Sequence, residues 1–195
     1  CKKLNQENNL NYGEEQIVVS TGAKQSLANI FLAILNAGDE VILQNPCWVS
    51  YTELIKLADG VPVIVDCDEN SGYKLSAKNI EKVLTSKTKA ILLNSPHNPT
   101  GIVYDKKELE EIAELAKKNN LIIISDEIYE KLIYDGKEHV SIASLSEDSY
   151  ERTIVVNGLS KTYAMTGWRV GYTASSAKLA KVMSNIQSHM TSNVC

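Results

Sequence analysis

Six short runs rich in β-branched residues recur along this chain, and segments with helical periodicity separate several of them. The runs occupy residues 17–19, 41–43, 61–65, 90–93, 121–124 and 153–156. Residues 27–35 and 109–116 each place apolar side chains on one helical face, and Ser76 suits the N-cap of a helix reaching about Leu84. This alternation predicts an α/β fold, a three-layer α/β/α arrangement around a mostly parallel sheet of roughly seven strands.

Length and charge narrow the class of protein. The 195 residues suffice for one domain with its own core, and we find no repeat or linker within 1–195. A net charge of −4 gives no indication of nucleic acid or of an anionic membrane surface, and no apolar run is long enough to span a membrane. The cysteines show no CxxC spacing and form no ligand pattern with the three histidines, so we expect no metal site and no disulfide framework. Reduced thiols of a cytoplasmic protein fit this pattern better.

Polar signals follow four of the runs, where an open α/β sheet binds its ligands. Gly22 lies between the first run and a helix, which suits a phosphate cradle, although an ordinary strand–helix turn is the more common outcome for so short a glycine pattern. Prolines flank Asn98 on both sides, so the loop is stiff. It either orients the Asn98 side-chain amide toward a ligand or is a rigid structural turn.

The last two runs are followed by an acid and by a lysine. Asp126 follows a buried strand, where a carboxylate needs a cationic partner, or else it caps a helix. Glu127 is the less interesting carboxylate if its side chain points away from the site. Lys161 follows the run at 153–156, and Arg169 lies eight residues further on. A lone lysine is usually a solvated charge, whereas burial lowers its pKa and makes its amine a nucleophile.

Five segments in this order carry a resemblance that covers essentially the whole chain: TGAKQ, NPCWVSY, NSPHNPTG, SDEIYE and NGLSKTYAMTGWRVGY. The chain resembles the class I/II aminotransferases of pyridoxal phosphate fold type I, and is most similar to their bacterial aspartate aminotransferase branch. The resemblance implies a cofactor, pyridoxal 5′-phosphate, and identifies 1–195 as the cofactor-binding large domain.

The resemblance also implies roles for individual residues. Lys161 matches the lysine that forms a Schiff base with the cofactor and then moves a proton at the substrate. Asp126 matches the acid that pairs with the protonated pyridine nitrogen. Asn98 and Tyr129 match the pair that hydrogen-bonds the ring oxygen, and Trp48 matches the aromatic side chain that stacks on the ring, in preference to a core tryptophan.

The phosphate of the cofactor has its own implied partners. Its cradle matches the backbone N–H groups of three consecutive residues, Gly22, Ala23 and Lys24. Arg169 matches their charged partner. Many relatives have a serine three residues before the lysine, where this chain has Gly158, so that one hydroxyl contact is in doubt while Ser160 remains.

The substrate half of such an enzyme has no counterpart here. Relatives bind the substrate α-carboxylate with an arginine of a C-terminal small domain, whereas this chain has only Arg152 and Arg169. The chain begins at Cys1 and stops at Cys195 in mid-pattern, so we expect a piece of a longer protein that lacks the N-terminal arm and the small domain. Such a piece is expected to bind the cofactor weakly and to turn over little.

The resemblance implies amino-group transfer between an amino acid, with aspartate favoured, and a 2-oxo acid, in a protein that forms homodimers. Two alternatives remain open. A β-lyase of the same fold shares every residue named above, and some transcription regulators carry an aminotransferase-like domain that senses the cofactor. A Rossmann-like domain with other ligands is disfavoured because no GxGxxG follows a strand.

Overall fold

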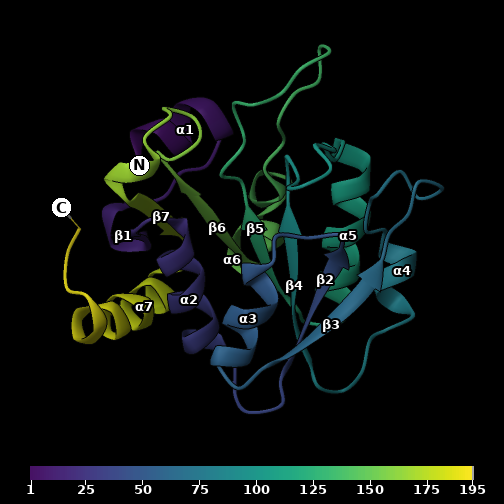
Figure 1. The fold of residues 1–195 in the computed structure, drawn as a ribbon, viewed down its shortest axis with the longest axis horizontal. Helices are drawn as coiled ribbons and strands as arrows, with labels where there is room; N and C mark the ends of the chain where they lie inside the picture. The colour runs from purple at the N-terminus through teal and green to yellow at the C-terminus, as the bar shows by residue number, and fades with distance from the viewer. Residues whose placement is uncertain (195) are drawn as a thin grey trace.

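The computed structural model describes residues 1–194, which form one seven-stranded sheet with helices on both faces (Figure 1). The strands are β1 (Ile17–Thr21), β2 (Glu40–Asn45), β3 (Val61–Asp66), β4 (Thr88–Asn94), β5 (Ile122–Asp126), β6 (Thr153–Gly158) and β7 (Val170–Ala174). The α-helices are α1 (Lys2–Asn8), α2 (Ala23–Ile34), α3 (Ser50–Leu57), α4 (Ala77–Glu81), α5 (Lys106–Lys118), α6 (Glu147–Arg152) and α7 (Ala177–Met190).

The sheet has the strand order β1-β7-β6-β5-β4-β2-β3. Strands β3, β2, β4, β5 and β6 are parallel, and β7 runs antiparallel to both of its neighbours, β6 and β1. The carboxyl ends of β4, β5 and β6 therefore meet at one edge of the sheet, which is the edge where an open α/β sheet binds ligands.

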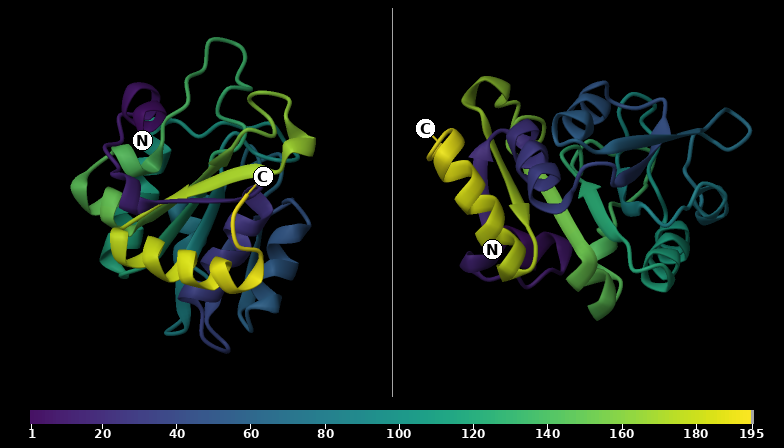
Figure 2. Two further views of the ribbon diagram at one scale, coloured as in Figure 1. Left: turned by 90° about the vertical axis from the view of Figure 1, so that its left-hand side faces the viewer. Right: turned by 90° about the horizontal axis from the view of Figure 1, so that it is seen from below.

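The central strands are buried on both faces, as expected for parallel strands. In β2, Val41 and Leu43 pack with α2, α3 and α7, whereas Ile42 packs on the opposite face with α4 and α5. Helix α1 closes a smaller core with Val155 and Ala174. Figure 2 shows the resulting three layers, with α7 lying alongside α2. No helix among residues 1–194 is long and apolar enough to cross a membrane.

The predicted fold class is confirmed, and all six β-branched runs lie in strands, except that β5 begins at Ile122. Ser76 caps α4 by accepting a hydrogen bond from the Asn79 N–H at 3.2 Å. The predicted end of this helix at Leu84 is wrong, because α4 ends at Glu81. The chain must turn back into β4, and the Thr88 N–H donates to the Thr85 carbonyl to close that turn.

Candidate active site

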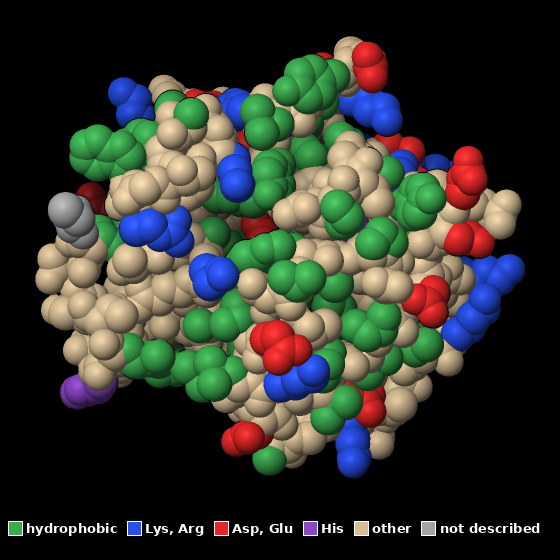
Figure 3. Space-filling view, in the orientation of Figure 1, with side chains coloured by type: hydrophobic (Ala, Val, Ile, Leu, Met, Phe, Trp, Pro, Cys, Tyr) green, Lys and Arg blue, Asp and Glu red, His purple; other side chains and the backbone are tan. Residues whose placement is uncertain are grey.

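A cavity of about 320 Å³ lies at the carboxyl ends of the central strands, beside the first turn of α2. Its lining residues come from five separate segments of the chain: Ala23, Lys24, Trp48, Tyr51, Asn98, Asp126, Ile128, Tyr129, Ser160, Lys161, Thr166 and Arg169. Nine of the ten predicted site residues are among them, and Gly22 lies directly behind Arg169. In Figure 3, Lys and Arg side chains lie along the left side of a hollow near the middle of the face shown. The structure thus gathers the predicted residues, while their roles remain predictions.

Asp126 ends β5 on the floor of this cavity, and only 3% of its surface is exposed. Burial raises the pKa of its carboxyl group to about 6, although hydrogen bonds to the ionised form oppose the change. The Ile128 N–H donates to Asp126 at 3.2 Å, and no helix follows at this point, so the helix-capping alternative is wrong. Within residues 1–194 no Lys, Arg or His forms an ion pair with Asp126. The carboxylate therefore has room for a cationic ligand.

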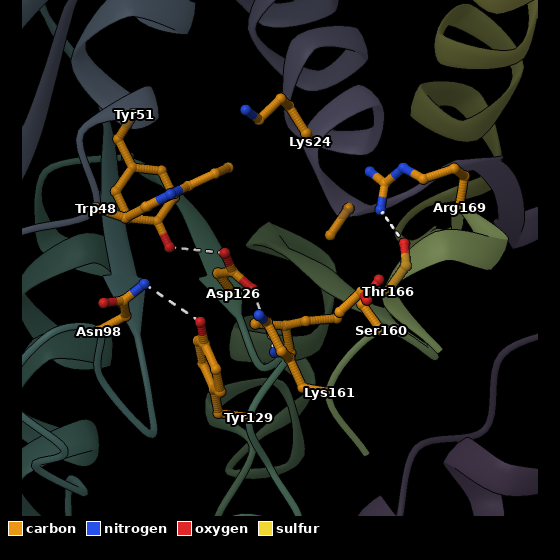
Figure 4. A pocket seen from close by; sticks show the side chains of 12 residues that line it. Lys24, Trp48, Tyr51, Asn98, Asp126, Tyr129, Ser160, Lys161, Thr166 and Arg169 are labelled. Atoms are coloured by element: carbon orange, nitrogen blue, oxygen red, sulfur yellow. Dashed lines mark hydrogen bonds between the residues drawn. The ribbon is translucent and has the colours of Figure 1, made fainter. Parts of the chain in front are cut away.

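Tyr51 is a site residue that the sequence motifs contain but that sequence reasoning did not single out. Its hydroxyl group donates to the Asp126 carboxylate at 2.7 Å from the first turn of α3 (Figure 4). Its ring packs edge-on against Trp48, with 5.3 Å between the centroids. The spacing of three residues between Trp48 and Tyr51 is the one available signal, because it places both aromatic rings on one side of a helical turn.

We expect Tyr51→Phe to raise the pKa of Asp126 above about 6. The Tyr51 hydroxyl stabilises the ionised carboxylate, so its loss favours the protonated form by about one pH unit. Titration of the Asp126 carboxyl carbon by NMR in the cofactor-free protein measures this directly. Tyr134→Phe makes the same change at an exposed tyrosine and should leave the midpoint where it is. An unaltered midpoint in Tyr51→Phe would contradict this interpretation of the contact.

Asn98 and Tyr129 face each other across the cavity from neighbouring strand ends. The Asn98 Nδ2 donates to the Tyr129 hydroxyl at 3.2 Å, as Figure 4 shows. The loop that carries Asn98 is tied to β5 through Asn94, which accepts from the Asn98 N–H at 2.8 Å and donates to the Asp126 carbonyl at 2.9 Å. Asn94 is a positioning residue that the motif alone does not reveal. The Lys161 ammonium lies 5.5 Å from the centre of the Tyr129 ring.

Lys161 is only half-buried, so the structure does not show the buried lysine that the sequence analysis considered. The lysine follows β6 in a turn that lines the cavity, and the turn itself is exposed. Trp48 is also half-buried and lines the cavity, which removes the alternative of an ordinary core tryptophan.

The first turn of α2 and Arg169 form a concave, positively polarised corner of the cavity. Gly22 is the N-cap of α2 with φ 81°, and the N–H groups of Ala23 and Lys24 have no acceptor among residues 1–194. A Cβ atom on Gly22 would lie 2.2 Å from the Arg169 Nη2, and one on Gly171 would lie 2.3 Å from the Ala23 nitrogen. Gly171 is therefore required by close contact with backbone atoms, whereas Gly22 is favoured by its positive φ, and the corner suits an anion.

The sequence model of the family described as aminotransferase class I and II matches residues 1–195. The chain belongs to this family. The match confirms the resemblance inferred from the five motifs.

Relatives of this chain are similar to it in sequence and in fold. It is 50% identical over 192 residues to an aspartate aminotransferase of Bacillus sp. (strain YM-2), a match that covers 98% of the chain and 49% of the relative. The structure of the Thermus thermophilus aspartate aminotransferase with maleate is 42% identical, with a TM-score of 0.95 over 99% of this chain and 50% of that one. An aromatic aminotransferase of Pyrococcus horikoshii is 43% identical, with a TM-score of 0.95 over 98% and 51% of the two chains. The chain thus spans about half the length of the relatives it matches.

The glycine at position 158 has a steric explanation. A Cβ atom on Gly158 would lie 2.7 Å from the Val170 carbonyl oxygen and 2.9 Å from the Gly171 Cα, because β6 and β7 approach closely there. A serine would push the two strands apart. Ser160, with 9% of its surface exposed, lines the cavity, as does Thr166.

Glu127 is fully buried and points away from the cavity. It accepts hydrogen bonds from Ser125 at 2.9 Å and Ser141 at 2.6 Å, and it pairs with His139 at 3.0 Å. Together with Glu130, the Glu127 and His139 side chains place possible metal-ligand atoms within 4.8 Å of one another. Ser125, Ser141 and His139 already surround the Glu127 carboxylate, so we assign these residues to holding the segment that follows β5.

Proposed function

We propose that this chain binds pyridoxal 5′-phosphate, and that the complete polypeptide carrying it transfers amino groups between amino acids and 2-oxo acids. One observation carries the proposal: a lysine, a buried acid without a cationic partner, and an anion-binding corner face a single cavity. The three groups match the aldehyde, the pyridine nitrogen and the phosphate of the cofactor.

The residues present fit this cofactor in size and charge. The volume of about 320 Å³ is at the lower end of the range for small-molecule sites. The backbone at Gly22 and Ala23 packs directly on Gly171, which has no side chain, and it lies beside the Arg169 guanidinium, an arrangement that suits close approach of a phosphate to the backbone. The buried Asp126 would gain a favourable partner in a protonated pyridine nitrogen.

Each residue then has a definite task. When bound, the cofactor supplies an electron sink for negative charge at the α-carbon of the amino acid. The Asp126 carboxylate keeps a proton on the ring nitrogen, and the hydrogen bond from the Tyr51 hydroxyl positions that carboxylate. Asn98 and Tyr129 orient the ring through its oxygen, and the amine of Lys161 accepts and returns the proton at the α-carbon.

The chain alone is expected to turn over little, because the group that would bind the substrate α-carboxylate is not evident. Arg152 binds Asp148 through two of its nitrogens, at 2.6 and 2.7 Å, and donates to the Leu121 carbonyl at 3.0 Å, away from the cavity. Arg169 serves the anion-binding corner. We therefore place the substrate arginine outside residues 1–194.

Aspartate is the amino donor that we favour. The relatives in Bacillus and Thermus are named aspartate aminotransferases, and the Thermus structure is described with maleate, a dicarboxylate like aspartate. The Pyrococcus relative is named an aromatic aminotransferase, which keeps an aromatic donor as the alternative substrate. We also propose that the protein is cytoplasmic, since Cys1, Cys47 and Cys67 are free thiols. We propose a homodimer because the apolar Trp168, which adjoins Arg169, is exposed.

The test mixes the complete polypeptide, loaded with pyridoxal phosphate, with L-aspartate in the absence of a 2-oxo acid. We expect one equivalent of oxaloacetate per site and loss of the cofactor absorbance band of the loaded protein. This band should return on addition of 2-oxoglutarate. Tyrosine in place of aspartate tests the aromatic alternative, and the 195-residue chain tests for residual turnover.

Other products would identify the competing functions. Given an S-substituted cysteine, a β-lyase would expel the thiol and release ammonia and pyruvate continuously without needing an acceptor. A sensor domain would bind the cofactor without releasing any product. Robust transfer by the 195-residue chain alone would contradict our placement of the substrate arginine.

A further inference from the structure

The C-terminal end of α7 is joined to the anion-binding corner by a group of polar side chains that the proposed reaction does not use. Four side chains form this group, which we call the α7 brace: Gln25, Asn29, Gln187 and Thr191. Gln25 and Asn29 belong to α2, whereas Gln187 and Thr191 lie at the end of α7. Figures 1 and 2 show the two helices packed beside each other.

Gln187 is the centre of the α7 brace, and only 6% of its surface is exposed. Its side-chain oxygen accepts from the Ser20 hydroxyl at 2.6 Å and from the Asn29 amide at 2.9 Å. Its amide nitrogen donates to the Val19 carbonyl at 2.8 Å. One buried amide thus holds the last residues of β1 and the first turns of α2, on either side of Gly22.

Gln25 holds the same turn from within α2. Its side-chain oxygen accepts from the Thr21 N–H at 2.7 Å, and its amide nitrogen donates to the hydroxyl of Thr191. The Thr21 N–H is therefore already bonded. The N–H groups of Ala23 and Lys24 remain available to a ligand in the cavity.

The turn between β1 and α2 is closed by a backbone hydrogen bond from the Gly22 N–H to the Ser20 carbonyl at 2.7 Å, and the α7 brace adds side-chain hydrogen bonds to it. Gly22, at φ 81°, has access to many backbone conformations that a larger residue lacks. On the β7 side the turn rests on Gly171, which offers no side chain to hold it. The hydrogen bonds of the α7 brace come from the opposite side and from both ends of the turn.

We propose that Gln25 and Gln187 are positioning residues for the phosphate of the cofactor. They hold the backbone around Gly22 so that the Ala23 and Lys24 N–H groups and Arg169 converge on one anion. This inference rests on the proposed function. If so, the affinity for the phosphate depends on how α7 packs against α2, because Gln187 and Thr191 lie at the end of α7.

The test compares pyridoxal phosphate with pyridoxal, which lacks the phosphate, in the complete polypeptide and in Gln25→Met and Gln187→Met. Methionine keeps the length of glutamine and removes its hydrogen bonds. We expect each variant to bind pyridoxal phosphate about tenfold more weakly while its affinity for pyridoxal stays the same. The ³¹P chemical shift of the bound phosphate should also move.

Gln44→Met is the matched control. Gln44 is equally buried, and it accepts from the Tyr104 hydroxyl at 2.8 Å and donates to the Tyr73 carbonyl at 2.9 Å on the opposite face of the sheet. Its loss should lower stability and leave the ratio of the two affinities unchanged. If Gln187→Met fails to fold, the partly exposed Gln25 supports the same comparison.

Two outcomes overturn the proposal. Equal weakening of both ligands shows a general structural role, and unchanged affinity for both ligands shows that the corner does not depend on the brace. Failure of the proposed function looks different, because the unaltered protein would then bind neither pyridoxal phosphate nor pyridoxal at Lys161.

Discussion

Replacement of Lys161 by alanine is expected to abolish covalent attachment of pyridoxal phosphate and to reduce amino transfer by at least about ten-thousandfold in the complete polypeptide. The amine is needed both to hold the cofactor and to move the proton, and no neighbour can perform both tasks. The cavity contains one other lysine among residues 1–194, Lys24. Its ammonium lies 5.0 Å from the Trp48 ring centre, whereas that of Lys161 lies 5.5 Å from the Tyr129 ring centre, so the two amines occupy different walls.

Borohydride reduction followed by peptide mass spectrometry identifies the lysine that is attached. The unaltered protein should carry the label on Lys161, and Lys161→Ala should carry none. Lys24→Ala is the matched control, because it removes the other amine of the cavity and should leave the label on Lys161. A label on Lys24 in the unaltered protein would falsify the assignment.

Asp126→Asn is expected to lower the transfer rate about a thousandfold, the order of effect seen when one preorganised electrostatic partner is removed. The amide keeps the shape of the carboxyl group and still accepts from Tyr51, but it carries no negative charge to hold a proton on the ring nitrogen. Steady-state kinetics with aspartate and 2-oxoglutarate measure the loss. Asp135→Asn, at an exposed loop position, is the matched control and should retain full activity.

The same substitution should flatten the pH dependence of stability in the cofactor-free protein. Burial raises the pKa of Asp126 from 3.8 to about 6, so its contribution is fully present below pH 3.8 and is lost as the pH rises through 6. The difference corresponds to about 3 kcal/mol, of which roughly half is lost between pH 5 and pH 8. A cationic ligand beside the carboxylate would offset this cost.

Thermal unfolding at pH 5 and pH 8 tests this expectation. Relative to Asp126→Asn, the unaltered cofactor-free protein should lose about 3–5 °C more between the two values. Saturation with pyridoxal phosphate should reduce this difference in the loss of melting temperature. Equal pH dependence of the two proteins would mean that Asp126 is not the buried acid that we describe.

The fold followed from local sequence because its strands are recognisable without their partners. Parallel strands buried on both faces require short runs of branched apolar residues, and six such runs were visible. Strand β7 and helices α3 and α7 were less evident from sequence. Trp168, just before β7, and Met190, at the end of α7, are both exposed although apolar. They therefore weaken the alternation of apolar and polar residues from which these two elements could have been predicted.

Several site residues were also evident before the structure, for a geometric reason. The residues that follow parallel strands must converge at one edge, and the pairing of Asn94 with Asp126 in adjacent strands brings Asn98 and Tyr129 within hydrogen-bond distance. The order of the polar signals along the chain was therefore sufficient to indicate one site.

The sequence by itself determined the α/β class, the family, and nine of the twelve residues that line the cavity. Only the tertiary structure decided which side chains support them. Tyr51 reaches Asp126 across 75 residues, and Gln187 reaches Ser20 across 167. No local periodicity encodes such contacts, because they depend on how α3 and α7 pack against the sheet. Gly158 likewise became understandable only when β6 and β7 were seen to leave no space for a side chain.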